Sequence, residues 1–205
     1  FDWFLHTLTI VNADEILFPI AHVFGEDAKI LKFGNRLMST FSTGVKGILP
    51  VKKEIERNEK NAEIFETLER NNGAILDRTT PYGGERISYS MEDGKLIEES
   101  LNTTHADNEG RDIPFSLSME SDGTKRLLDY IPMLHSILKD GSVVVIDEIE
   151  RSIHPAVIKE LIRLISADDK MNGQLIFSTH ETCLLDQDIL RTDEIWFAQK
   201  DQVGA

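Results

Sequence analysis

The sequence lacks several features that would place it in other classes of protein. Only one of its 205 residues is cysteine, Cys183, so no disulfide can form within the chain. No apolar run approaches the ~20 residues that a membrane-spanning helix needs. Residues 1–11 also lack the basic flank and the small-residue cleavage site of a signal peptide. We therefore expect a cytoplasmic protein that makes no use of a membrane.

Positive charge is also scarce. The chain has 22 Lys and Arg residues against 36 Asp and Glu residues, which gives a formal net charge of −14. A broad basic face for nucleic acid is therefore not favoured, although a locally basic patch or a basic partner stays open. The content of 40% hydrophobic and 28% charged residues is that of a globular protein, and no internal repeat is visible.

A third absence concerns phosphate binding. A P-loop (Walker A motif) needs G-x-x-x-x-G-K-[ST], in which main-chain amides and the lysine cradle the phosphates of a nucleotide. The only Gly-Lys pair of the chain is Gly94-Lys95, which is followed by Leu96, and Tyr89 stands where the first glycine is required. The chain therefore contains no such loop.

The residues before Ser118 have the patterns of a mixed α+β region. Apolar spacing predicts helices over three segments, the last of which is highly charged and mostly exposed: 1–10, 27–41 and 51–72. Residues 85–101 alternate around the sequence EDGK, and an Asp-Gly pair between two such arms is a strong hairpin signal. Residues 111–117 favour one further strand.

From Ser118 onward the pattern becomes that of a parallel α/β sheet. A helix is predicted over 125–139, with Pro132 as a kink or restart. The apolar runs predict three strands, 143–147, 174–180 and 194–199, and a helix from Pro155 to about Ser166. Strands that alternate with helices at this spacing indicate an α/β fold with a parallel sheet.

Polar side chains follow two of these predicted strands. Asp147 and Glu148 end the first strand, and Ser178, Thr179 and His180 end the second. The carboxyl ends of neighbouring parallel strands meet at one edge of a sheet, where ligands bind. Two acids and a histidine there suit metal-assisted phosphate chemistry. Taken alone, an acid pair can also be a solvated strand end, and a single histidine is often structural.

A second polar element lies at the start of the helix that precedes these strands. The sequence SMESDGTKRLLDYIP places Ser121 and Gly123 just before the basic residues Lys125 and Arg126. A serine hydroxyl, a glycine amide and a helix N-terminus together can form an anion site. The alternative is a simple helix cap, with Ser121 or Asp122 as the N-cap residue and Gly123 in a turn.

The order of these elements resembles the second half of an ABC-type ATPase nucleotide-binding domain, with signature motif, Walker B strand, D-loop and H-switch. The segments DEIERSIHP, ESDGTKRLLD and TDEIWFAQKD are most similar to stand-alone bacterial AAA/ABC-type ATPases of the RecF-like and SMC-like branch. The resemblance is strong over 115–201 and looser before. It implies a P-loop NTPase fold, ATP and Mg²⁺ as ligands, a homodimer, an effector partner, and a role in anti-phage defence or DNA repair.

The same resemblance implies a role for each residue at the strand ends. Asp147 would support Mg²⁺, directly or through water, Glu148 would activate the attacking water, and His180 would be the switch histidine. Ser152 and His154 would lie in the D-loop at a dimer interface.

Ser121, Gly123 and Thr124 would contact the γ-phosphate of ATP held by the opposite subunit. The signature departs from the Ser-Gly-Gly-Gln pattern, because Asp122 places a negative charge near that phosphate. Two basic residues could offset this charge, Lys125 and Arg126.

The expected organisation has three parts. Residues 1–19 form a linker and helix from a preceding ATPase lobe, 20–117 an inserted α+β subdomain, and 118–205 half of an ATPase core. Members of the family carry a P-loop before the segment that matches residue 1 and continue past Ala205. We therefore expect the chain to be a piece of a longer ATPase that is inactive alone.

Two other functions stay open at this point. Paired acids and a histidine could bind metals for a nuclease that acts directly on nucleic acid. Alternatively, the charged segment 51–72 and the hairpin 85–101 could dock a partner protein, with the core as a scaffold.

Overall fold

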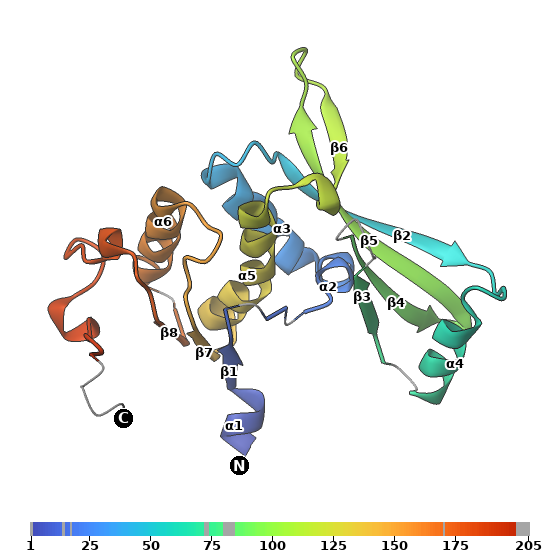
Figure 1. Ribbon diagram of the computed structural model, residues 1–205, viewed down its shortest axis with the longest axis horizontal. Coiled ribbons are helices and arrows are strands. Elements are labelled where there is room, and N and C mark those ends of the chain that lie inside the picture. The colour runs from blue at the N-terminus through green and yellow to red at the C-terminus, as the bar shows by residue number, and fades with distance from the viewer. Residues whose placement is uncertain are drawn as a thin grey trace. The chain divides into compact units, whose positions relative to one another are not determined.

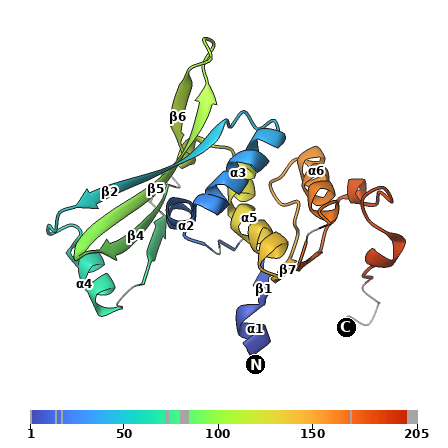
Figure 2. The same ribbon diagram turned by 180° about the vertical axis from the view of Figure 1, so that it is seen from behind.

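A computed structural model describes residues 2–13, 15–16, 18–71, 74–79, 85–169 and 171–199. The chain divides into two units, the first formed by Phe1–Ala13 with Ile137–Ala205 and the second by Asp14–Ser136. Figure 1 and Figure 2 show the elements of each unit from two sides. Within the described residues, no helix combines the length and the apolar character that a membrane span requires.

The first unit contains a three-stranded parallel sheet in the order β1-β7-β8. Its strands are β1 (Leu8–Val11), β7 (Val143–Ile146) and β8 (Gln174–Phe177). The helix between the last two strands is α6, Pro155–Ser166, and the proline stands in the first turn, where its missing N–H costs nothing. The predicted parallel α/β sheet and the helix that begins at Pro155 are confirmed.

Two segments of this unit differ from the prediction. The helix expected over residues 1–10 is shorter, because α1 is Asp2–His6 and the residues after it form β1, which pairs with β7. A short apolar run is compatible with either structure when periodicity alone is considered. The third strand predicted at 194–199 is wrong, since this segment begins in the 3₁₀ helix η3 (Thr192–Glu194) and continues without strand structure. An apolar pattern makes a strand only where a partner satisfies its main-chain hydrogen bonds.

The two faces of the parallel sheet differ in burial. Val144 and Ile146 point to one face and are buried. Ile10, Val145 and Ile176 lie side by side in the register of the sheet and point to the other face. Ile10 and Ile176 are exposed there. Parallel sheets usually have both faces covered, so the described residues leave one apolar face of this sheet open.

The second unit contains an antiparallel sheet of five strands. The strands are β2 (Gly47–Ile55), β3 (Leu76–Thr79), β4 (Arg86–Glu92), β5 (Lys95–Ala106) and β6 (Asp112–Ser116). Their order is β2-β5-β4-β3, and β6 pairs with β5. The predicted hairpin and the strand at 111–117 are confirmed. Asp93 and Gly94 have φ values of 49° and 77°, and a two-residue turn with φ above zero at both positions matches the twist of the flanking strands.

The helices of the second unit are α2 (Ile20–Glu26), α3 (Ala28–Thr40), α4 (Ala62–Arg70) and most of α5 (Asp122–Lys139), whose last three residues belong to the first unit. α3 confirms the helix predicted over 27–41, and Asp27 caps it by accepting the N–H groups of Lys29 and Ile30. α5 runs through Pro132 without a restart. The 3₁₀ helix η1 (Leu117–Met119) precedes it, and η2 (Thr182–Leu184) follows β8 in the first unit.

The helix predicted over 51–72 is only partly correct. α4 covers Ala62–Arg70, but residues 51–55 belong to β2, which pairs with β5. β2 is an edge strand, and edge strands commonly carry charged side chains that keep other chains from pairing with them. In the sequence, a charged edge strand and an exposed helix face therefore look alike, which explains the incorrect prediction over residues 51–55.

Candidate active site

The carboxyl ends of β7 and β8 bring Asp147 and Ser178 together, because the two strands are parallel and in register. The hydroxyl of Ser178 donates to Oδ1 of Asp147 at 2.5 Å and accepts the N–H of Glu148 at 2.9 Å. The main chain of Ser178 donates to the carbonyl of Ile146 at 3.0 Å. One serine therefore links the side chain of the aspartate to the main chain of the glutamate.

Glu148 directs its carboxylate toward His180. Its φ of 49° lies in the left-handed region, which residues other than glycine seldom adopt and which often marks a functional position. Oε1 of Glu148 lies 3.8 Å from Nε2 of His180, and Oε2 lies 3.5 Å from Nη1 of Arg151. The side chains of Glu148 and His180 are 39% and 86% exposed, so both can reach a ligand. The structure thus brings Asp147, Glu148 and His180 to one edge of the sheet, as predicted.

Glu150 supports this edge, although no pattern in the sequence predicted it. Its Oε1 accepts the main-chain N–H of His180 at 2.8 Å. Burial by itself raises the pKa of Glu150, but hydrogen bonds from the His180 N–H and the Thr179 hydroxyl outweigh burial and lower this pKa below its ordinary value. Glu150 therefore stays ionised and holds the segment after β8 in place. The contact joins residues 30 positions apart, so no local signal in the sequence could have found it.

Ser152 and His154 lie between β7 and α6. Ser152 is exposed and has a φ of 63°, again in the left-handed region. His154 is the N-cap residue of α6, and its Nδ1 accepts the N–H of Ala156 at 3.2 Å. His154 therefore has a local structural role, and the place of both residues at a dimer interface stays a prediction.

Ser121, Gly123 and Thr124 lie at the start of α5, in the second unit. The N–H of Thr124 donates to Oγ of Ser121 at 3.1 Å, and the two hydroxyl oxygens are 2.9 Å apart. Ser121 is therefore the residue that caps α5 with its side chain, and Asp122 stands in the first turn. The serine hydroxyl and the first amides of an 18-residue helix lie close together here, as an anion site needs.

The two basic residues that follow Thr124 have different surroundings. Nζ of Lys125 lies 3.6 Å from Oδ1 of Asp122, whose side chain is exposed. Arg126 is buried, and its guanidinium donates to the hydroxyl of Tyr130 at 3.2 Å and to the carbonyl of Glu15 at 2.8 Å. Lys125 thus contacts Asp122, and the hydrogen bond of Arg126 to Glu15 connects α5 to the rest of its unit.

The donor set at the strand ends fits Mg²⁺. Asp147 is exposed and offers carboxylate oxygens, and the hydroxyl of Ser178 lies beside it. Mg²⁺ prefers oxygen ligands and is commonly held by one or two carboxylates together with water and the phosphates of a substrate. The protein therefore supplies too few ligands to enclose the ion alone, and its donor set fits an ion whose remaining ligands are water and the phosphates of a nucleotide.

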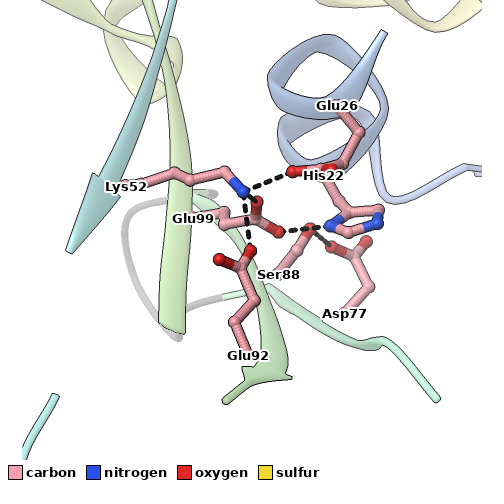
Figure 3. A network of polar contacts seen from close by, with 7 residues as sticks. All are labelled: His22, Glu26, Lys52, Asp77, Ser88, Glu92 and Glu99. Carbon is pink, nitrogen blue, oxygen red and sulfur yellow. Dashed lines mark hydrogen bonds and ion pairs between the residues drawn. The ribbon is translucent and has the colours of Figure 1, made fainter. Parts of the chain in front are cut away.

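The described residues hold one other group of metal-ligating side chains, His22, Glu26 and Glu99, in the second unit. Figure 3 shows that the ammonium of Lys52 lies in this group. It contacts Glu26, lies 2.7 Å from Glu92 and 3.1 Å from Glu99. Burial by itself lowers the pKa of Lys52, but its hydrogen bonds to the three carboxylates raise this pKa well above its ordinary value. The cation of this network is therefore the lysine, and we interpret the group as an ion network.

A comparison with models of protein families matches most of this chain. A family model described as "AAA domain, putative AbiEii toxin, Type IV TA system" matches residues 3–186. A search among curated proteins finds no match. One similar solved structure is the "SMC head domain from Thermotoga maritima", with 14% identity and a TM-score of 0.40 over 86% of this chain and 45% of that chain.

A second similar structure is described as "Structural biochemistry of ATP-driven dimerization and DNA stimulated activation of SMC ATPases". Its identity is 14% and its TM-score 0.39, over 80% of this chain and 76% of that chain. The chain thus spans less than half the length of the Thermotoga head domain. The family model, in contrast, spans most of the chain. The chain belongs to this AAA-domain family.

Proposed function

We propose that the chain carries the hydrolytic part of an ATPase site, which works in a nucleotide-dependent dimer. The observation that carries this proposal is the hydroxyl of Ser178, which connects Asp147 to the main chain of Glu148. His180 lies beside the carboxylate of that glutamate. Membership of the AAA-domain family supports ATP as the ligand.

Each residue at this edge has one task in the proposed mechanism. Bound Mg²⁺ supplies charge neutralisation at the phosphates of ATP, and Asp147 with Ser178 would hold it, directly or through water. Glu148 accepts a proton from the attacking water. His180 donates a hydrogen bond to a phosphate oxygen and helps to place that water.

Glu148 suits the role of base better than the two acids near it. Oδ1 of Asp147 accepts a hydrogen bond from Ser178, which directs this carboxylate to the metal position. Glu150 accepts the N–H of His180 and has a lowered pKa, which makes it a weaker base. Glu148 is partly exposed and lies near the imidazole, where a water can reach it.

The second part of the proposal concerns the partner subunit. Ser121, Gly123 and Thr124 would present a hydroxyl and helix amides to the γ-phosphate of ATP bound by a second copy of the protein. Ser152 and His154 would contact that copy in the D-loop. Closure of the dimer would then signal to an effector protein in the cytoplasm. Anti-phage defence is the role we favour, because the family description names a toxin–antitoxin system, and DNA repair is the alternative.

The test is ATP hydrolysis by the full-length protein. We expect Mg²⁺-dependent phosphate release, and we expect Ser178→Ala to reduce the rate about 10–100-fold because Asp147 loses the group that orients it. Ser166→Ala, at the exposed end of α6 in the same unit, serves as the control and should keep the wild-type rate. Unchanged hydrolysis in Ser178→Ala would contradict the proposal. Cleavage of DNA by the same samples would instead favour a nuclease.

The 205-residue chain alone should bind ATP only weakly. The reason is that it contains no G-x-x-x-x-G-K-[ST] sequence, and this loop supplies most contacts to the phosphates in P-loop proteins. Titration calorimetry with Mg²⁺-ATP would measure the affinity, with the full-length protein as reference. Tight binding by the 205-residue chain would show that the phosphates are held in another way.

A further inference from the structure

A buried carboxylate stands directly before the residue that caps α5. Glu120 is only 9% exposed, and the exposed Ser121 follows it. Oε1 of Glu120 accepts a hydrogen bond from the hydroxyl of Thr103, and Nε2 of His105 lies 2.6 Å from the same oxygen. The proposed function gives no role to this contact, which reaches from the signature segment to the antiparallel sheet of the second unit.

The partners of Glu120 are themselves firmly placed. Thr103 and His105 are two residues apart on β5, so their side chains point to the same face of the sheet. β5 pairs with β2, β4 and β6. The ring of Phe115 on β6 packs against His105 with ring centroids 4.5 Å apart. The oxygen of Glu120 therefore meets two donors whose positions the sheet fixes.

Burial restricts the position of the Glu120 carboxylate. Burying a carboxylate without hydrogen-bond partners costs several kcal/mol, so the hydrogen bonds from Thr103 and His105 favour the position in which Glu120 meets them. The Cα atom of Ser121 lies about 3.8 Å from that of Glu120, as in any trans peptide. The placement of the glutamate therefore limits where the Ser121 hydroxyl and the first amides of α5 can be.

We propose that Glu120 is a positioning residue, which ties the signature segment Ser121–Thr124 to strand β5 of the antiparallel sheet. Through this contact, anything that shifts β5 shifts the groups that meet the nucleotide of the opposite subunit. This inference rests on the proposed function for its nucleotide, but the link between Glu120 and Ser121 can be tested without one.

The first test is amide hydrogen exchange of the full-length protein without nucleotide. Glu120→Ala should speed exchange at Thr124 and Lys125 about tenfold or more, because these N–H groups bond to Ser121, which loses its anchor. Glu120→Gln keeps an acceptor oxygen for Thr103 and should restore most of the protection. Unchanged exchange in Glu120→Ala would overturn the proposal.

A matched pair of histidine variants separates positioning from general loosening of the sheet. Nδ1 of His22 lies 2.6 Å from Glu99 on the same strand β5, which repeats the distance between His105 and Glu120. His105→Gln should speed exchange at Thr124, whereas His22→Gln should not. An equal effect of both variants would show that only the sheet has softened, and would overturn the proposal.

The second test uses ATP. In Glu120→Ala, the ATP concentration needed for half-maximal dimer formation should rise about tenfold. The affinity of a single subunit for ATP should stay at the wild-type value, because Asp147, Glu148 and His180 lie in the other unit and are unchanged. A purely structural defect would raise this concentration and lower the single-subunit affinity together. Faster exchange in a protein whose wild type forms no ATP-dependent dimer would contradict the proposed function and still support the placement of Ser121 by Glu120.

Discussion

Replacement of Glu148 by glutamine in the full-length protein is expected to lower the rate of ATP hydrolysis by roughly 10²–10⁴-fold, the usual contribution of a positioned general base. Glutamine has nearly the same shape and keeps the backbone hydrogen bond from the Glu148 N–H to Ser178, so the site should stay intact. It cannot accept the proton of the attacking water. ATP would therefore remain bound, and the closed dimer should accumulate.

Two measurements check this expectation. Phosphate release gives the hydrolysis rate, and size-exclusion chromatography with and without ATP gives the dimer fraction. Glu160→Gln is the matched control, since this residue also lies in the first unit but pairs with Arg163 on the surface of α6. Turnover at the wild-type rate in Glu148→Gln would show that another group accepts the proton.

The second large effect concerns stability. Lys52→Met is expected to destabilise the second unit by about 3 kcal/mol, because it leaves the carboxylate of Glu99 buried without its ammonium partner. Glu99 is 1% exposed, and His22 would be its remaining partner in the network. This loss of stability lies at the lower end of the ~3–5 kcal/mol that removal of one partner from a buried ion pair costs, because the Lys52 side chain is itself 35% exposed to water.

Lys95→Met provides the control for this variant. Nζ of Lys95 lies 2.8 Å from Glu54, but both side chains are more than half exposed, so the change should cost less than about 1 kcal/mol. Glu99→Gln added to Lys52→Met should recover part of the loss, because it removes the buried charge. Hydrogen exchange resolved by peptide would follow the second unit separately. Equal effects of the two lysine variants would show that the Lys52 network contributes no more than a surface pair.

The sequence allowed the placement of Asp147, Glu148 and His180 at one edge of the sheet to be predicted, because this placement follows from one rule. Asp147 comes directly after β7 and His180 three residues after the end of β8, and neighbouring parallel strands bring their carboxyl ends to one edge of the sheet. The hairpin was predictable for a similar reason, since Asp93 and Gly94 are the residue types that tolerate positive φ.

The missed features depend on partners far away in the chain. β1 is a strand because it pairs with β7, about 135 residues later, and nothing in its own four residues shows this. Residues 51–55 are a strand because β5 pairs with them. Ser178, Glu150 and Glu120 act through contacts of 15 to 31 residues in separation, which only the folded chain reveals.

The open face of the parallel sheet bears on how this unit can be produced and kept in solution. Ile10, Val145 and Ile176 form an apolar row across all three strands, and among the described residues the outer strands, β1 and β8, each have one unpaired edge. Unpaired strand edges next to an exposed apolar surface are common sites of aggregation between chains. We therefore expect the described residues alone to aggregate, or to need chaperones, as long as this apolar face of the sheet stays uncovered.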